Sequence, residues 1–335
     1  MPRVLRLAPF VCLSFALLLS GSAQAEEPLL SRDRELGVMG TDLVLRAYGS
    51  DGAVLDAALD AAILEIQRVE DEMTDWRPSP LMDLNAAAGS GPTVVDPELF
   101  SILERSLELA EVTDGAFDIS FAAAGRLWSF EPGGAAIPDS ATVTAALAHV
   151  GFRRIHLDAA ERSVDLPAGM RVGLGGIAKG YGVDRAMAVL MEHGVEHGVV
   201  NAGGDMKVLG LKNGEPWEIA IKHPRDRDRV LALLRVSNTC VVTSGDYERF
   251  FEIEGKRYHH ILDPRTGYPS TGCLSATVIA PSARDADALA TACCVLGPDE
   301  ALRLVELLPR TEALLVGMDG VVHTSSGLEG LTAGD

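Results

Sequence analysis

The sequence predicts an α+β fold in which mostly antiparallel sheets are flanked by helices. Of its 335 residues, 47% are hydrophobic and 23% are charged, a composition typical of a globular protein with a substantial core. Helical periodicity is clearest over residues 55–73, whereas the second half of the chain alternates short β-rich runs with turn residues. Consecutive strands with few helices between them favour antiparallel pairing over a doubly wound parallel sheet.

The expected elements follow the chain in order. A strand over residues 38–48 precedes a long amphipathic helix, which should end near Trp76 because prolines follow at positions 78 and 80. That helix is predicted from apolar residues recurring at steps of three and four, namely Leu55, Leu59, Ile63, Ile66, Val69 and Met73. Further helices are expected at 98–112, 140–150 and 175–193, with short strands near residues 155 and 164. Strands then follow at 199, 217–221, 230–236, 240–243, 250–261 and 274–279, before one more helix and two last strands.

The N-terminus has the pattern of a secretory signal peptide. Arg3 and Arg6 precede an apolar run over 7–19, and Ala23-Gln24-Ala25 provides a small-residue cleavage site. About 13 apolar residues are too few to span a bilayer comfortably, so an uncleaved anchor is the weaker alternative. We expect cleavage of residues 1–25, which leaves 26–335 as one domain in the periplasm. Ser22 stands where a lipobox would require cysteine, so a lipid anchor is not expected.

The charge balance argues against nucleic acid as a partner. The chain has 29 Lys and Arg against 48 Asp and Glu, a formal net charge of −19, and no basic block offsets it. A phosphate backbone would therefore be repelled rather than bound.

The cysteines do not form a zinc pattern. Of the five, Cys12 lies in the predicted signal peptide, and the spacing of Cys240, Cys273, Cys293 and Cys294 is not that of a metal site. Cys293 and Cys294 are adjacent on a predicted helix, where their side chains point apart and a disulfide between them would be strained. Buried free thiols are the expected state.

The glycine-rich segment from Gly173 to Gly180 matches two nucleotide-binding patterns only in part. Gly173-Leu-Gly-Gly-Ile-Ala178 fits G-x-G-x-x-A, but the next strand ends in Asn201-Ala-Gly-Gly instead of the acidic residue of a dinucleotide fold. It is not a P-loop either, because Lys179 is followed by glycine rather than Ser or Thr. Two interpretations remain: a phosphate site at a helix N-terminus beside Lys179, or a tight helix start with a solvated lysine.

The helix expected after Pro281 carries a candidate magnesium site. Ser282 and Asp285 have the spacing of an N-cap and its reciprocal partner, whereas capping gives no reason for Asp287. Asp287 and Thr291 lie four residues apart and share one helical face. A carboxylate with a hydroxyl suits Mg²⁺, which prefers oxygen ligands. The alternative is a surface aspartate with a threonine that bonds back to its own helix.

A third segment, Tyr258 to Tyr268, contains two histidines that leave a predicted strand beside Asp263 and Arg265. Such a histidine could act as a general base. Because alternate residues of a strand point to opposite faces, at most one of His259 and His260 can face a given site. An ordinary Asp-Pro turn with an exposed histidine is the alternative.

Together these segments resemble the FAD:protein FMN transferases of the ApbE family. The resemblance is an ordered series of short motifs across nearly the whole chain after the signal peptide. In order it reads Met39-Gly-Thr41; Trp76-Arg-Pro with Leu84-Asn85; Thr113-Asp-Gly-Ala-Phe117-Asp118 with Leu127-Trp128; Gly-Gly-Ile-Ala-Lys-Gly-Tyr within 173–184; Asn201-Ala-Gly-Gly-Asp205; Thr243-Ser-Gly-Asp-Tyr247-Glu-Arg249; His260-Ile-Leu-Asp-Pro; and Ala286-Asp287-Ala-Leu-Ala-Thr291-Ala.

The resemblance implies a cleft for FAD with Mg²⁺ at its pyrophosphate. Metal ligands are implied at Asp287, Thr291 and the carbonyl of Gly176. Cofactor contacts are implied at Met39, Trp76, Ala116, Phe117, Asp118, Gly173, Lys179 and Ile261. The chain departs from the family at Gly173, where aspartate is usual, so the contact at that position is open.

The same resemblance implies the reaction. A Thr or Ser hydroxyl of an acceptor protein would attack the FMN-side phosphorus of FAD, with His260 as base, and AMP would leave. The implied acceptors are exported subunits of membrane redox complexes. Two alternatives stay open: hydrolysis of FAD to FMN and AMP, and a non-catalytic periplasmic protein that only binds FAD.

Overall fold

The structure, a computed structural model, describes residues 29–131 and 133–332 and confirms the α+β class. Its centre is an eight-stranded sheet in the order β1-β2-β6-β7-β10-β13-β14-β15, in which every neighbouring pair is antiparallel. The strands are β1 (Leu30–Val38), β2 (Thr41–Gly49), β6 (His197–Ala202), β7 (Asp205–Leu209), β10 (Thr239–Gly245), β13 (Cys273–Ala280), β14 (Glu312–Gly317) and β15 (Val322–Thr324).

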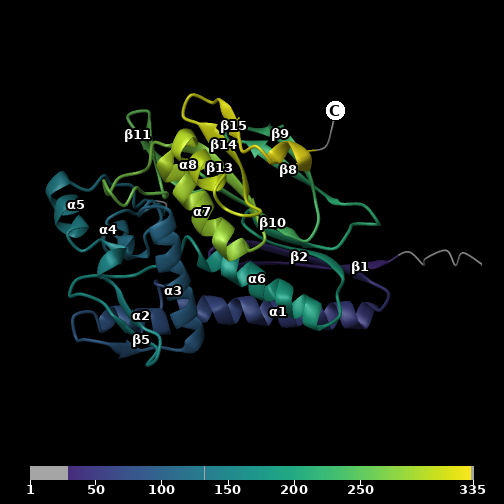
Figure 1. Cartoon of the computed structure of the whole chain (residues 1–335), viewed down its shortest axis with the longest axis horizontal. Helices are drawn as coiled ribbons and strands as arrows, with labels where there is room; N and C mark the ends of the chain where they lie inside the picture. The colour runs from purple at the N-terminus through teal and green to yellow at the C-terminus, as the bar shows by residue number, and fades with distance from the viewer. Residues whose placement is uncertain (1–28, 132, 333–335) are drawn as a thin grey trace, which may run out of the picture.

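Three helices cover this sheet and contact one another in turn: α1 (Gly52–Met73), α6 (Ala178–Glu192) and α7 (Ala283–Leu296). Figure 1 shows α7, α6 and α1 as successive rods beside the strands. The predicted apolar repeat of α1 faces the core, since Leu55, Leu59, Ile66, Val69 and Met73 are buried. The side chain of Asp51 caps the helix by accepting hydrogen bonds from the amides of Ala53 and Val54.

A smaller group of elements packs at one end of these helices, on the left of Figure 1. It contains α2 (Pro80–Ala86), α3 (Pro97–Val112), α4 (Ala122–Gly125), α5 (Ser140–Leu147) and a three-stranded sheet of β3 (Thr93–Val94), β5 (Ser163–Asp165) and β4 (His156–Asp158). Two hairpins form separate two-stranded sheets, β8 (Trp217–His223) with β9 (Asp226–Val236), and β11 (Phe250–Ile253) with β12 (Lys256–His259). The β8–β9 hairpin packs on the central sheet through an apolar cluster that includes Trp217, Val208 and Val316. Short 3₁₀ turns lie at Ile119–Phe121, Phe152–Arg154 and Leu328–Leu331.

The structure corrects the expected elements in several places. The strand expected over 250–261 is the β11–β12 hairpin, and α2 and β3 were not predicted. The strand expected over 38–48 is β2, which starts after a turn at Met39 and Gly40, both with positive φ, and the strand β1 that precedes the turn was missed. The strand β7 was also missed. A second C-terminal helix, α8 (Pro298–Val305), starts after Gly297, whose φ of 80° breaks α7.

Other expectations have mixed outcomes. The predicted signal peptide lies outside the described residues. Within 29–131 and 133–332, no helix combines the length and apolarity needed to cross a bilayer.

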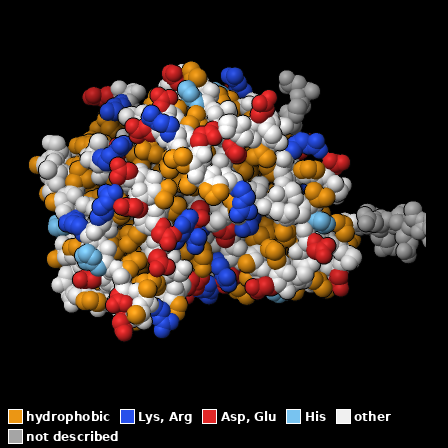
Figure 2. Space-filling view, in the orientation of Figure 1, with side chains coloured by type: hydrophobic (Ala, Val, Ile, Leu, Met, Phe, Trp, Pro, Cys, Tyr) orange, Lys and Arg blue, Asp and Glu red, His pale blue; other side chains and the backbone are white. Residues whose placement is uncertain are grey.

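Cys240, Cys273, Cys293 and Cys294 are buried and unpaired, as predicted. On the face shown in Figure 2, acidic and basic side chains are interspersed.

Candidate active site

The candidate site lies where the first turns of α6 and α7 meet. A Cβ atom on Gly180 would lie 2.1 Å from the carbonyl oxygen of Ala283, so the two backbones touch and only glycine fits. This contact brings the carboxylate of Asp287 to α6, where it accepts a hydrogen bond from the Gly180 amide at 3.2 Å. The glycine-rich helix start therefore positions Asp287 at the positive end of α6.

Lys179 joins two buried carboxylates at this point. Its ammonium lies 2.8 Å from Asp205 Oδ2 and 3.2 Å from each carboxylate oxygen of Asp287. Both aspartate side chains are 2% exposed. The interpretation of Lys179 as a solvated side chain is thus wrong. The alternative of Asp287 as a surface aspartate is wrong as well.

The pKa values in this cluster follow from burial and charge. Burial raises the pKa of Asp205 above its usual value, and the adjacent Asp287 carboxylate adds to the shift. Burial opposes the charge on Lys179, but the attraction of Asp205 and Asp287 outweighs it and raises the lysine pKa. Lys179 is therefore a cation at physiological pH.

The predicted metal donors are brought together. A Cβ on Gly176 would lie 3.3 Å from Thr291 Oγ1, so the Gly176 backbone lies against the threonine hydroxyl. No hydrogen bond to that hydroxyl occurs in the described part of the chain, which rejects the threonine bonded back to its helix. A buried carboxylate and an available hydroxyl on one helix face, with the Gly176 backbone beside the hydroxyl, are oxygen donors of the kind that Mg²⁺ prefers.

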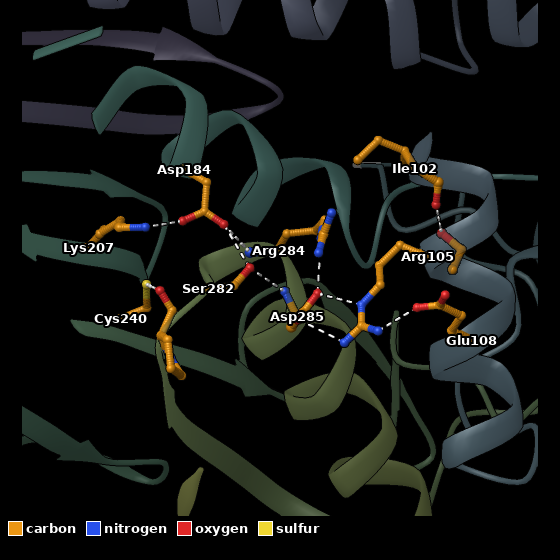
Figure 3. A network of polar contacts seen from close by, with 11 residues as sticks. Ile102, Arg105, Glu108, Asp184, Lys207, Cys240, Ser282, Arg284 and Asp285 are labelled. Carbon is orange, nitrogen blue, oxygen red and sulfur yellow. Dashed lines mark hydrogen bonds and ion pairs between the residues drawn. The ribbon is translucent and has the colours of Figure 1, made fainter. Parts of the chain in front are cut away.

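Asp285, in contrast, is an ion-pairing residue. Ser282 caps α7 as predicted, because its Oγ accepts from the Asp285 amide at 3.3 Å. The reciprocal half of the predicted cap is wrong: the Asp285 carboxylate binds Arg105 at 2.9 and 3.1 Å and Arg284 at 2.9 Å (Figure 3). Burial alone would raise the pKa of Asp285, but the guanidinium groups outweigh it and lower the pKa.

His260 follows β12 and is accessible to solvent, whereas His259 is 4% exposed and its Nε2 bonds the carbonyl of Ser270 at 3.0 Å. The prediction that the two rings take opposite faces is confirmed. Desolvation by the surrounding protein, with the positive charge of Lys179 nearby, lowers the pKa of His260 to about 4. His260 is therefore a neutral imidazole at physiological pH, able to accept a proton.

The main chain ties His260 to the rest of the site. The His260 amide donates to the Arg249 carbonyl at 3.0 Å, and the Arg249 side chain donates to the carbonyl of Gly40 at 2.8 Å. Gly40 belongs to the β1–β2 turn that also presents Met39. A hollow of about 370 Å³ is lined by this turn and Glu70. The larger FAD cleft stays a prediction.

Asp246, in the motif from Thr243 to Arg249, is a second acidic group that could be considered as a base, but it is paired with arginine. Its buried carboxylate binds Arg225 at 2.6 and 2.5 Å, with Arg257 at 3.7 Å. A bidentate guanidinium pair of this kind holds both carboxylate oxygens, so Asp246 is less suited than His260 to take a proton.

The other predicted cofactor contacts divide into two groups. Phe117 lies 3.4 Å from a Cβ built on Gly176, and Met39 Sδ lies 3.2 Å from one built on Gly182, so both adjoin the start of α6. Trp76 is an exposed ring after α1, and Ala116 and Ile261 are buried. Asp118 is engaged in structure, because its carboxylate accepts from Ser120 and from the Phe152 amide.

At Gly173 the structure shows why a larger residue is hard to place. A Cβ there would lie 2.9 Å from the Ala122 side chain and 3.4 Å from Asp75 Oδ2. Gly173 carries no carboxylate, but Asp75 brings one to the same place from the segment after α1.

Sequence reasoning missed Asp205 as a site residue. Its position at the end of the motif that starts at Asn201 could have indicated a role. Without the folded structure, however, Asp205 was indistinguishable from an ordinary aspartate at a turn. A separate acidic group, Glu72, Asp96 and Glu98, shares none of the predicted ligands. The guanidinium of Arg68 already bonds Glu98 there at 2.6 and 2.8 Å.

Comparisons with known proteins agree with this arrangement. The profile of the ApbE family matches residues 39–315. The FAD:protein FMN transferase of Treponema pallidum (strain Nichols) is 40% identical over 310 residues, which cover 87% of this chain and 86% of that protein. A Klebsiella pneumoniae (strain 342) protein of the same name is 35% identical over 86% of this chain and 90% of its own. The crystal structure of the ApbE protein from Thermotoga maritima superposes with a TM-score of 0.84 at 32% identity, covering 91% of this chain and 100% of that one.

Proposed function

This chain belongs to the ApbE family, and from that premise we propose that it transfers FMN from FAD to a Thr or Ser hydroxyl of an acceptor protein, releasing AMP. One observation carries the proposal. Asp287 meets the ammonium of Lys179 and the Gly180 amide at the start of α6, and Thr291 on the same helix face lies against the Gly176 backbone. Such a place suits a divalent cation together with the pyrophosphate of a dinucleotide.

Each side chain has a role in this proposal. The Asp287 carboxylate, the Thr291 hydroxyl and the Gly176 carbonyl would hold Mg²⁺. When bound, the ion would offset negative charge on the two phosphates of FAD. Lys179 would add a positive charge beside them. Met39, Phe117 and Trp76 would contact the rest of FAD.

We assign His260 as the base in the transfer step. The acceptor oxygen forms a bond to the FMN-side phosphorus while the bond from that phosphorus to the bridging oxygen breaks, and AMP leaves with the electron pair. The proton of the acceptor hydroxyl goes to the neutral imidazole of His260. The flavin ends as a phosphoester on the acceptor.

The test is incubation of the purified protein with FAD, Mg²⁺ and candidate acceptor domains, followed by in-gel flavin fluorescence and intact mass. We expect a covalent flavin on the acceptor that is lost when EDTA is added. An acceptor whose Thr or Ser is changed to Ala is the matched control. Free FMN and AMP without acceptor labelling would instead identify a hydrolase, and unchanged bound FAD would identify a binding protein.

We further propose that the chain is exported and cleaved before Glu26, so that it meets exported subunits of membrane redox complexes as acceptors. The sequence pattern of residues 1–25 supports this. Intact mass of protein recovered from the periplasm tests it. A mass that retains residues 1–25, or that includes acyl chains, would contradict it.

A further inference from the structure

Two buried carboxylates share one ammonium at the centre of the site. Asp205 comes from β7, Asp287 from α7 and Lys179 from α6. Lys179 Nζ lies 2.8 Å from Asp205 and 3.2 Å from both oxygens of Asp287. One ammonium therefore serves two carboxylates.

The two carboxylates have different surroundings. Asp287 also contacts the Gly180 amide, and it shares a helix face with Thr291 beside Gly176. Among the described residues, the Asp205 carboxylate bonds Lys179 and lies beside the Asp287 carboxylate. Asp205 is the first residue of β7 and lies between two neighbouring strands, paired with Ala202 of β6 and Val242 of β10. Asp287 is therefore the one of these two carboxylates that shares its helix face with Thr291 beside Gly176.

We propose that Lys179 is a placeholder cation that neutralises Asp287 until a divalent cation binds there, and that Asp205 is the positioning residue that then retains Lys179. This inference rests on the proposed function, because it takes Asp287 as a metal ligand. A lysine side chain is flexible enough to leave Asp287 while it stays on Asp205, its closer partner. Its ammonium then remains beside the site.

The test is Mg²⁺ binding to the protein without FAD, measured by isothermal titration calorimetry and by the Mg²⁺-dependent shift in the thermal unfolding midpoint. Lys179→Met removes the competing cation. We expect Mg²⁺ to bind this variant at least ~5-fold more tightly than wild type, the effect of removing one like charge about 4 Å away even at the dielectric constant of water. Lys207→Met is the control, because Lys207 pairs with Asp184 on α6, away from Asp287. Its Mg²⁺ affinity should not change.

A double-mutant cycle tests Asp205. If Asp205 acts through Lys179, Asp205→Asn should weaken Mg²⁺ binding in wild type but have a much smaller effect when Lys179 is already Met. An equal loss in both backgrounds would make Asp205 a direct ligand or a simple through-space charge, and would overturn its positioning role. Unchanged or weaker Mg²⁺ binding in Lys179→Met would overturn the placeholder itself.

Loss of folding does not block the test. If Lys179→Met alone fails to fold, Asp205→Asn is compared with the double variant, which keeps Asp287 as the one carboxylate. The placeholder then requires tighter Mg²⁺ binding in the double variant. The Mg²⁺-binding cycle does not depend on flavin transfer. Failure of wild type in the separate transfer assay would overturn the proposed function, whereas the placeholder role of Lys179 is decided by Mg²⁺ binding alone.

Discussion

Gly180 and Ala283 are in backbone contact, since a Cβ on the glycine would lie 2.1 Å from the alanine carbonyl oxygen. Because real Cβ atoms do not approach an oxygen so closely, α6 and α7 can lie at this separation only with glycine at position 180. The same contact places the Gly180 amide 3.2 Å from the Asp287 carboxylate. Helix packing and the construction of the site therefore depend on one residue.

Gly180→Ala should push α6 and α7 apart. We expect the free energy of unfolding to fall by about 1–3 kcal/mol, the usual cost of overpacking a close contact. Urea denaturation measures it. Gly175→Ala is the control, because a Cβ there meets no atom within 4 Å and Gly175 has no positive φ. Equal stability of the two variants would contradict the contact.

Asp287→Asn should abolish Mg²⁺-dependent transfer and leave the fold intact. Lys179 keeps Asp205 as a partner, and the repulsion between two buried carboxylates is removed. We expect a loss of activity of at least ~100-fold, because even residues that only support metal ligands contribute about 10- to 100-fold. Transfer assays with circular dichroism measure both effects.

Asp285→Asn is the matched comparison two residues earlier on the same helix. It removes the ion pair with Arg105 and Arg284, so it should cost about 1 kcal/mol of stability and spare most of the activity. The reverse pattern, an inactive Asp285 variant and an active Asp287 variant, would show that the ligand is misassigned.

Local sequence patterns predicted the elements that follow simple rules. The apolar repeat of α1 was visible because each residue that recurs on one face is buried by the sheet. The strand β1 was missed because it lies at the sheet edge, where Arg32, Arg34 and Glu35 interrupt any apolar alternation. Its turn at Met39 needs a positive φ from a residue type that does not favour it.

The site divides in the same way. Asp287 and Thr291 were predicted from a spacing of four within one helix, which is a local relation. The bond from Lys179 to Asp205 joins residues 26 positions apart, and the one to Asp287 joins residues 108 apart. Separations this long match no helix or strand repeat, so only the folded chain shows that all three charged groups meet.

The four buried cysteines should be unreactive in the folded protein. Burial raises the pKa of Cys240, Cys273 and Cys293 to about 12 and that of Cys294 well above its usual value, so almost no thiolate forms at neutral pH. We expect Ellman's reagent to label none of them in native protein lacking residues 1–25, and all four after unfolding in urea. Rapid labelling of a native thiol would contradict their burial.

His260 offers a test by pH, because its pKa is lowered from 6.5 to about 4. A general base must be neutral, so transfer should persist as pH falls below 6.5 and decline only as pH approaches 4. Desolvation is the main cause of this shift, and the titratable and charged neighbours His259, Lys179 and Arg249 add to it, whereas the hydrogen bond with the Arg249 backbone opposes it. A ring with an ordinary pKa would instead lose activity around pH 6.5.

Folding must be followed in the same experiment, because the shift also acts on stability. The unfolded chain binds a proton at His260 below pH 6.5 and the folded chain does not until about pH 4, so stability is lost as pH falls between these values. Between pH 7 and pH 5, His260→Ala should therefore lose less free energy of unfolding than wild type does.

The same variant should bind FAD normally and transfer FMN about 100- to 10,000-fold more slowly, the usual contribution of a general base. His259→Ala, in which the buried neighbour is changed, should retain most of the chemistry and lose stability instead. Near-normal transfer by His260→Ala, or loss of FAD binding as its main defect, would remove His260 from the role of base.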